Sequence, residues 1–336
     1  MIRIGLVGAG KRMQQMNLPI LKQLSSRVKV VGITTRRGKV DTSSIGLNNI
    51  PVYDSLDKMY EETEPDLVII SIPYTQAFEV LKKVIPKKVP ILVETPISFD
   101  LTQTNIIRQM TQHYDCLLGV IEDWLYLPME CFKKRIIKKG ILGDIMVVEN
   151  DYRTYDYHGI AQIKGYLPKN VFPVSVKQEQ SAYRVEEKID HWKITTAKFN
   201  NGALFINKYS SLYKKVDFRI RKELRIYGTK GTIMSGCLLD SHCLISVLDE
   251  QGKSQDLKVV KEYAKSNIKN ISTTLHTGEK IEWENPFVSM DLTEAQNGIM
   301  YNFEKMFQNI EKKQKTVLYG SNDFFNDLKT FHGINQ

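Results

Sequence analysis

The first 121 residues alternate between short apolar runs and longer stretches in which apolar residues recur at three- and four-residue spacing. The runs are rich in β-branched residues, which is typical of parallel strands covered by helices on both faces; they span residues 2–7, 28–34, 67–72, 91–94 and 116–121. Helical spacing is found between most of them, at residues 17–24, 55–62, 75–84 and 100–114. This alternation predicts a doubly wound parallel sheet. The polar, glycine-containing segment 38–49 predicts a loop.

The pattern changes after residue 121. A helix is predicted after Pro128, and strand-like segments follow at residues 145–152, 193–200, 203–210, 216–227, 232–235 and 243–248. Asn200-Asn201-Gly202 is a hairpin signal, which indicates antiparallel neighbours. The sequence therefore predicts two domains, residues 1–121 and 122–336, the second built on a mostly antiparallel sheet.

Three further segments complete the second half of the chain. Helical patterns predict helices over 287–310 and 323–331. The polar stretch 249–284 is interpreted as a lid, an oligomer arm or a solvated excursion, and its central part is predicted to be a solvated loop.

The first predicted strand runs directly into Gly8-Ala9-Gly10. Gly8 would allow a tight turn, Gly10 would let backbone N–H groups approach a pyrophosphate, and the following helix would offer its positive end. Met13 stands where a third glycine is usual, so the motif alone is a weak signal, and the strand and helix around it carry the interpretation. We predict nucleotide contacts from this loop, namely Gly8, Gly10, Lys11, Arg12 and Met13.

The end of the second predicted strand indicates which nucleotide is bound. An NAD site usually presents an acid there, whereas this chain has Thr35, Arg36 and Arg37. Guanidinium groups pair with phosphate in a bidentate way, so the segment favours the 2′-phosphate of NADP over NAD. The alternative is two solvated arginines on a loop.

Composition excludes several protein classes. The chain has 336 residues, of which 42% are hydrophobic and 25% charged, as in ordinary globular proteins. Its net charge of +9 comes from scattered lysine doublets rather than a nucleic-acid motif. The four cysteines lack metal spacing, so neither metal nor disulfide is expected. No apolar run would span a membrane and the first strand begins at Ile2, so we expect a cytoplasmic protein.

Six segments together carry a family resemblance. In order they are 5–10 (Gly-Leu-Val-Gly-Ala-Gly), 71–73 (Ser-Ile-Pro), 92–96 (Leu-Val-Glu-Thr-Pro), 122–128 (Glu-Asp-Trp-Leu-Tyr-Leu-Pro), 140–144 (Gly-Ile-Leu-Gly-Asp) and 224–232 (Leu-Arg-Ile-Tyr-Gly-Thr-Lys-Gly-Thr). Over almost the whole chain, the set resembles the glucose–fructose oxidoreductase / inositol dehydrogenase / rhizopine catabolism (Gfo/Idh/MocA) family.

The resemblance implies a Rossmann domain followed by an α/β domain with an open, mostly antiparallel sheet. It also implies hydride transfer between a nicotinamide and usually a sugar or cyclitol. Homodimers or homotetramers would form through the exposed face of the second sheet, which includes Ala203, Phe205 and Asn207 or the opposite face. Cofactor contacts are implied for Ser71, Ile72, Pro73, Glu94, Thr95, Pro96, Asp123 and Tyr126, although Tyr126 and Trp124 are equally well explained as aromatic packing.

The chain departs from the family at its usual catalytic groups. The family has Glu-Lys-Pro where this chain has Glu94-Thr95-Pro96. A threonine hydroxyl cannot act as an ammonium acid, although Thr95 could still hydrogen-bond a substrate. Leu125 stands where relatives commonly have arginine, which also argues for a changed substrate.

A second family pair, an aspartate four residues before a histidine, leaves only His158 in this chain. Its imidazole suits proton transfer near neutral pH, while the alternative is a helix-start residue bonded to backbone. Tyr155 and Asp156 complete the catalytic candidates, with Thr95.

Loss of the lysine and the aspartate leaves three interpretations. An imine or carbonyl needs less help from a protein acid or base than a secondary alcohol does. We therefore expect an NADP(H)-dependent reductase of a small biosynthetic imine or carbonyl, with a proton from His158 or a neighbouring tyrosine. Biliverdin reductase and the thiazolinyl imine reductases resemble this chain in lacking the lysine. The alternatives are a sugar or cyclitol dehydrogenase and an inactive nucleotide-binding scaffold or sensor.

Overall fold

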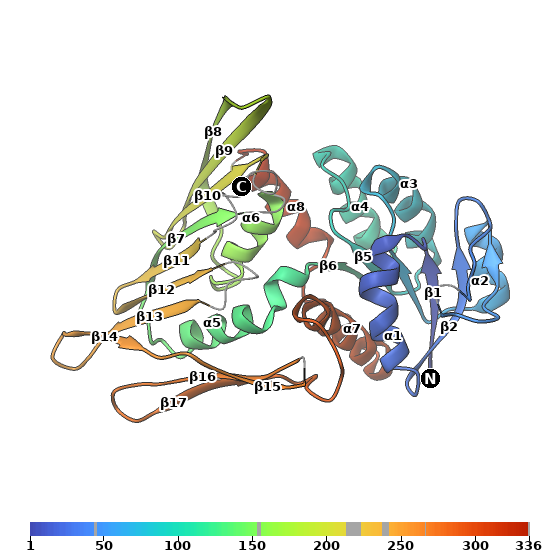
Figure 1. Cartoon of the computed structure of the whole chain (residues 1–336). Helices are drawn as coiled ribbons and strands as arrows, with labels where there is room; N and C mark the ends of the chain where they lie inside the picture. Colours follow the sequence, from blue (N-terminus) through green and yellow to red (C-terminus); the bar gives the residue numbers. More distant parts are fainter. Residues whose placement is uncertain (44–45, 153–155, 213–222, 237–241, 266, 335–336) are drawn as a thin grey trace. The chain divides into compact units, whose positions relative to one another are not determined.

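The computed structural model describes residues 1–43, 46–152, 156–212, 223–236, 242–265 and 267–334 (Figure 1). The chain divides into two compact units. Unit 1 contains Met1–Leu127, Lys265–Asn267 and Phe287–Phe325, and unit 2 contains Pro128–Ala264, Ile268–Pro286 and Asn326–Gln336. No helix in the described ranges is long and apolar enough to cross a membrane.

Unit 1 is built on a six-stranded parallel sheet in the order β3-β2-β1-β4-β5-β6. The predicted strands are present, with an added two-residue strand, β3. Their bounds are β1 Ile2–Val7, β2 Val28–Thr34, β3 Val52–Tyr53, β4 Leu67–Ile70, β5 Ile91–Glu94 and β6 Leu118–Ile121. Every residue of β4, β5 and β6 is buried, because helices cover the sheet and leave no solvent-facing side.

The helices of unit 1 follow the predicted alternation. They are the π-helical turn η1 Met13–Asn17, α1 Leu18–Gln23, α2 Leu56–Thr63, α3 Tyr74–Val84, the 3-10 turn η2 Ile85–Lys87, α4 Leu101–His113 and the 3-10 turn η3 Asp123–Tyr126. Asp100 caps α4, since its carboxylate accepts a 2.9 Å hydrogen bond from the backbone N–H of Gln103. The described part of segment 38–49 has no helix or strand, as predicted.

Helix α7 (Glu294–Lys312) belongs to unit 1, although it follows most of unit 2 in the sequence. Its buried side chains Phe303 and Met306 share the core with Leu92 and Ile121. The division therefore differs from a single boundary at residue 121, because strands β5 and β6 need the apolar face of α7 as their cover. The helix begins at Glu294 rather than at residue 287, since Thr293 forms a capping box with Gln296.

Unit 2 is built on an eight-stranded sheet in the order β14-β13-β12-β11-β7-β10-β9-β8. Only the β7–β10 pair is parallel; the other pairs are antiparallel, so the predicted fold class is confirmed. The strands are β7 Ile145–Tyr152, β8 Pro173–Val185, β9 Lys188–Phe199, β10 Leu204–Ser210, β11 Glu223–Gly228, β12 Gly231–Gly236, β13 Cys243–Leu248 and β14 Ser254–Leu257. The hairpin predicted at 200–202 joins β9 to β10.

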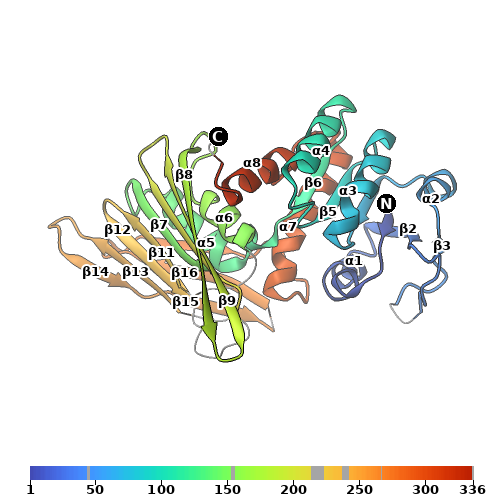
Figure 2. The ribbon, with the colours of Figure 1, turned by 90° about the horizontal axis from the view of Figure 1, so that it is seen from above.

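Helices cover one face of this sheet (Figure 2). Helix α6 (Asp156–Lys164) packs on β7 and β10. The other helices are α5 (Pro128–Lys138) and α8 (Ser321–Phe331), of which the part from Asn326 belongs to unit 2.

The central part of the polar stretch 249–284 is not a solvated loop, so that prediction was wrong. Besides β14, it contains β15 Val260–Ala264, β16 Asn267–Thr274 and β17 Lys280–Glu284, which form a three-stranded sheet. In β17 the apolar side chains Ile281 and Trp283 are buried between polar residues that are exposed or half-buried. In β16 the buried Ile271 lies between polar residues that are buried as well. Strand β8 was also missed.

Candidate functional site

A cavity of about 630 Å³ lies at the carboxyl ends of β1, β2 and β4. Open parallel sheets bind ligands at this edge. Seven of the predicted cofactor residues line the cavity: Gly8, Gly10, Thr35, Arg36, Ser71, Ile72 and Pro73. Residues that sequence reasoning missed complete the lining, chiefly Asp54, Ser55, Asp57, Gln76 and Lys83. Asp54 and Ser55 follow the short strand β3, and recognising that strand would have placed them at this edge.

The glycine loop leaves room for a close ligand. Gly8 has φ +93°, and a Cβ atom there would lie 2.4 Å from the carbonyl oxygen of Ser71. A Cβ atom on Gly10 would meet nothing within 4 Å. Gly8 is therefore required for the turn, whereas Gly10 keeps the backbone open toward whatever binds.

Helix N-termini give the cavity a positive polarity. Pro73, directly before α3, and Ser55, the N-cap of α2, both line it. Unpaired N–H groups and the helix dipole make such ends favourable for phosphate. The loop and the helix ends together fit the pyrophosphate of a dinucleotide.

Away from the glycine loop, the cavity is lined by both positively and negatively charged side chains. Arg36 is exposed and makes no hydrogen bond or ion pair with any residue that the structure describes. Lys83 adds a second cation, while Asp54 adds a carboxylate. Arg37 is exposed and does not line the cavity.

A charged cluster lies at the carboxyl ends of β5 and β6. Arg12 donates 3.0 Å hydrogen bonds to Glu94 through Nε and to Asp123 through Nη2. Asn17 donates to the same oxygen of Glu94, also at 3.0 Å. Both carboxylates are buried, and burial raises the pKa of Glu94 while Arg12 opposes the rise. The structure thus brings together three predicted cofactor residues in one network.

The neighbours of this cluster are held by structural contacts. The Thr95 hydroxyl donates to the backbone oxygen of Ile121 at 3.3 Å, and the peptide bond to Pro96 is cis. Tyr126 stacks on Tyr301 of α7, with ring centroids 5.6 Å apart.

Two loop residues differ from expectation. Met13 has no accessible surface and lies in the hydrophobic core of unit 1, so it offers no contact to a ligand. A large apolar side chain suits this position, because η1 packs it into the hydrophobic core. Lys11 is exposed and does not line the cavity.

The catalytic candidates of unit 2 lie on α6. Asp156 begins the helix and is buried, with its carboxylate 2.8 Å from the Lys193 ammonium and hydrogen-bonded by Asn207. Burial raises the pKa of Asp156, and Lys193 opposes that rise. His158 is buried beside Tyr157, with ring centroids 4.2 Å apart. Tyr155 lies outside the described residues, and Thr95 belongs to unit 1.

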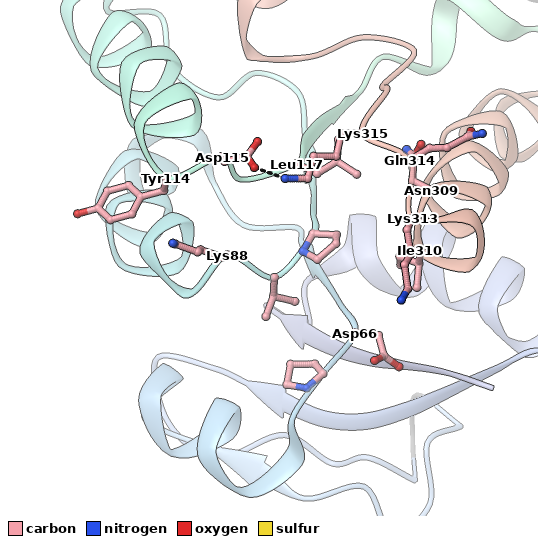
Figure 3. A pocket seen from close by; sticks show the side chains of 13 residues that line it. Asp66, Lys88, Tyr114, Asp115, Leu117, Asn309, Ile310, Lys313, Gln314 and Lys315 are labelled. Carbon is pink, nitrogen blue, oxygen red and sulfur yellow. Dashed lines mark hydrogen bonds and ion pairs between the residues drawn. The ribbon is translucent and has the colours of Figure 1, made fainter.

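A second cavity, of about 490 Å³, lies at the opposite edge of the parallel sheet (Figure 3). The C-caps of η2 and α7, Lys88 and Lys313, line it, as does Tyr114, the C-cap of α4. Helix C-termini carry partial negative charge, which lysines neutralise. Lys315 is paired with Asp115 there. This edge thus presents helix C-termini, whereas the first cavity presents helix N-termini. In the described ranges, no group of three histidine, cysteine or acidic side chains could hold a metal ion.

Comparison with known proteins identifies the N-terminal part. Residues 2–122 match the Gfo/Idh/MocA oxidoreductase family, described as an NAD-binding Rossmann fold. The uncharacterized protein YMR315W of Saccharomyces cerevisiae is 26% identical over 141 residues, which are 41% of this chain and 40% of that protein. The uncharacterized oxidoreductase C115.03 of Schizosaccharomyces pombe is 23% identical over 46% of this chain and 42% of its own length. The matches thus span about two fifths of these curated relatives.

Solved structures share the fold over nearly the whole chain. A Bacillus subtilis protein named putative oxidoreductase yvaA has a TM-score of 0.73 at 13% identity, and the match covers 99% of this chain and 94% of that one. UDP-N-acetylglucosamine 3-dehydrogenase GnnA of Acidithiobacillus ferrooxidans has a TM-score of 0.68 at 13% identity, with 99% and 96% covered.

Proposed function

We propose that this chain, whose residues 2–122 match the Gfo/Idh/MocA oxidoreductase family, is an NAD(P)-dependent oxidoreductase. The observation that carries the proposal is the cavity at Gly8 and Gly10, where an open glycine loop and helix N-termini fit a pyrophosphate. When bound, the nicotinamide nucleotide supplies or accepts a hydride at C4 of its ring. The protein's part is to hold the nucleotide along the sheet edge and to supply the proton.

NADP is the preferred nucleotide in this proposal. Arg36 and Lys83 are the cations of the far part of the cavity, and Thr35 adds a hydroxyl. Guanidinium and ammonium groups of this kind recognise a 2′-phosphate. Asp54 supports the other choice, because a carboxylate in this part of the cavity could accept the ribose hydroxyls of NAD.

Nucleotide titration of two variants separates these choices. Binding of NADPH and NADH is followed by nicotinamide fluorescence for wild type, Arg36→Ala and Asp54→Asn. If NADP is preferred, Arg36→Ala weakens NADPH binding about tenfold or more and leaves NADH almost unchanged. If NAD is preferred, Asp54→Asn weakens NADH instead. Binding of neither nucleotide to wild type contradicts the enzyme proposal and leaves a scaffold of this fold.

The proposed reaction is reduction of an imine or carbonyl of a small biosynthetic intermediate. In this proposal the Thr95 hydroxyl is not the acid, since it donates to a backbone carbonyl. His158 delivers the proton, and its helix is anchored through Asp156. A screen of imines, ketones and sugars with wild type and His158→Gln tests this role. If His158→Gln retains the turnover of wild type, the histidine is not the proton donor.

Sugar or cyclitol dehydrogenation is the second candidate. Its support is the resemblance described above and a similar fold in a sugar-nucleotide dehydrogenase. Oxidation of a polyol by wild type, with no reduction of imines, would favour it.

We also propose that the protein is a homodimer or homotetramer. On the sheet face away from α6, Leu204 and Met234 are 47% and 38% exposed, whereas their neighbours Phe205 and Ile233 are buried. Light scattering should show an oligomer that Leu204→Glu with Met234→Glu dissociates. Tyr263→Glu, an exposed position on β15, is the matched control. A monomeric wild type contradicts this proposal.

A further inference from the structure

Two buried carboxylates share one guanidinium beside the glycine loop. Glu94 ends β5, Asp123 begins η3 just after β6, and Arg12 lies 3.0 Å from each. The acids are only 7% and 4% exposed. The second oxygen of Glu94, Oε2, accepts no hydrogen bond from a described residue. It is therefore the oxygen of this cluster on which a proton can be placed without breaking a hydrogen bond to Arg12 or Asn17.

The cluster has two charge states that differ by one proton. With both acids ionised its net charge is −1, and with one proton bound it is neutral. Among the described residues, the charged groups that face Glu94 are Arg12 and Asp123, and Asn17 adds an amide. Burial and Asp123 favour the protonated form of Glu94, whereas Arg12 and Asn17 favour the ionised form.

The pair lies where the nicotinamide half of a bound dinucleotide would be expected. The cavity lies at β1, β2 and β4, and the pair lies at the same carboxyl edge on the next two strands, β5 and β6. A dinucleotide placed along this edge with its adenosine near Arg36 would extend its other half toward β5 and β6. The oxidised nicotinamide ring carries a positive charge, and the reduced ring is neutral.

We propose that the Glu94–Asp123 pair keeps one proton with the reduced nucleotide and releases it to solvent when the oxidised nucleotide binds. The inference rests on the proposed function. No bond of the nucleotide changes in this step, and the only bond broken is the carboxyl O–H. With the reduced nucleotide, a neutral cluster then lies beside a neutral ring. With the oxidised nucleotide, the cluster charge of −1 balances the ring charge of +1, so only the phosphates contribute net charge in either state.

Binding of the oxidised nucleotide should depend on pH. Low pH protonates the pair, so the oxidised nucleotide must displace a proton and binds more weakly. Its affinity rises with pH, by up to about tenfold per pH unit for one linked proton, and becomes constant once the pair is ionised. The affinity of the reduced nucleotide changes much less across the same range.

Calorimetric titration tests this without any substrate. Wild type, Glu94→Gln and Asp57→Asn are titrated with the oxidised and the reduced form of the preferred nucleotide, in two buffers of different ionisation enthalpy. The difference in apparent heat between buffers gives the number of protons released. The amide of the Glu94 variant keeps an oxygen for Arg12 and Asn17. Asp57 lines the cavity away from the pair, and its loss should act equally on both nucleotide forms.

We expect wild type and Asp57→Asn to release more protons with the oxidised than with the reduced form, and Glu94→Gln to show no difference. Should that variant not fold, Asp123→Asn replaces it, because it also removes one of the two carboxylates that contact Arg12. Equal proton release with both forms in wild type overturns the inference while leaving the proposed function intact. Failure of both forms to bind overturns the proposed function and the inference with it.

Discussion

Lys193 reaches across from β9 to place its ammonium 2.8 Å from the Asp156 carboxylate at the start of α6. The same ammonium lies 3.5 Å from the centre of the Phe331 ring. Both members of the ion pair are largely buried, with side-chain exposures of 14% and 4%. The ion pair between Asp156 and Lys193 therefore holds helix α6, which carries His158, against the sheet. Each of the two buried charges is stabilised by the other.

Lys193→Met should destabilise the protein in a pH-dependent way. The pKa of Asp156 is already raised by burial, and loss of the ammonium raises it further. Stability associated with the protonated form is present at low pH and is lost as the pH rises through the folded-state pKa. At pH 8 we expect a loss of about 3–5 kcal/mol, as for other buried pairs that lose one partner, and a clearly smaller loss near pH 5.

Thermal unfolding at the two pH values measures this effect. Lys208→Met is the matched control, since it breaks a more exposed ion pair with Glu149 on the same sheet. Its cost should be about 1 kcal/mol or less at both pH values. An equal cost of Lys193→Met at pH 5 and pH 8 would contradict the role given to Asp156.

Gly8→Ala and Gly10→Ala should have different consequences. At Gly8 the added methyl group meets a backbone oxygen at 2.4 Å and φ is +93°, so we expect a loss of about 2 kcal/mol or more together with loss of nucleotide binding. At Gly10 the methyl group meets nothing, so the unfolding midpoint should hardly change. Nucleotide affinity should nevertheless fall, because the methyl group occupies the approach of the pyrophosphate. Unchanged affinity in Gly10→Ala would place the nucleotide elsewhere.

Lys133 and Glu130 form a fully enclosed ion pair on α5, at 2.6 Å. Ser235 and Tyr166 complete its hydrogen bonds. Lys133→Met or Glu130→Gln alone should cost about 3–5 kcal/mol, since each leaves an uncompensated buried group. The double variant should cost less than the sum of the two, and additive costs in denaturant unfolding would show that the charges do not interact.

Thr293→Ala should remove the capping box of α7. The hydroxyl accepts from the backbone N–H of Gln296 at 3.3 Å, and the expected loss is about 1 kcal/mol. Thr102→Ala, on the exposed side of α4, is the control and should be close to neutral. Equal midpoints for the two variants in thermal unfolding would show that α7 does not depend on its cap.

The fold of unit 1 could be predicted because its strands are continuous apolar runs, which only a doubly covered parallel sheet can bury. The start of α7 could have been found from Thr293 and Gln296, which have the spacing of a capping box. Strand β8 was harder, because an edge strand that reads Val-Ser-Val-Lys-Gln-Glu-Gln has few positions that must be buried. The sheet in 249–284 was hidden because polar residues occupy many of its buried positions, as Asn270, Ser272 and Thr273 do in β16.

The candidate site was predictable only where chain order and chemistry coincide. Gly8, Arg36 and Ser71 follow strands whose carboxyl ends must share an edge. Asp54 and Lys83 line the same cavity because of how β3 and α3 pack. The local sequence pattern does not specify that packing. The bridge from Arg12 to both Glu94 and Asp123 joins residues far apart in the sequence, so no spacing rule could indicate it.

The late position of α7 has a consequence for how the protein is made. As the chain leaves the ribosome, β5 and β6 appear early, but the helix that covers them is synthesised only after residue 293. Until then the nascent parallel sheet exposes apolar side chains such as Leu92 and Ile121, a surface of the kind that chaperones recognise. A fragment that ends at Leu127 would lack this cover permanently, so we expect that cutting the gene after the last parallel strand does not yield a stably folded unit 1.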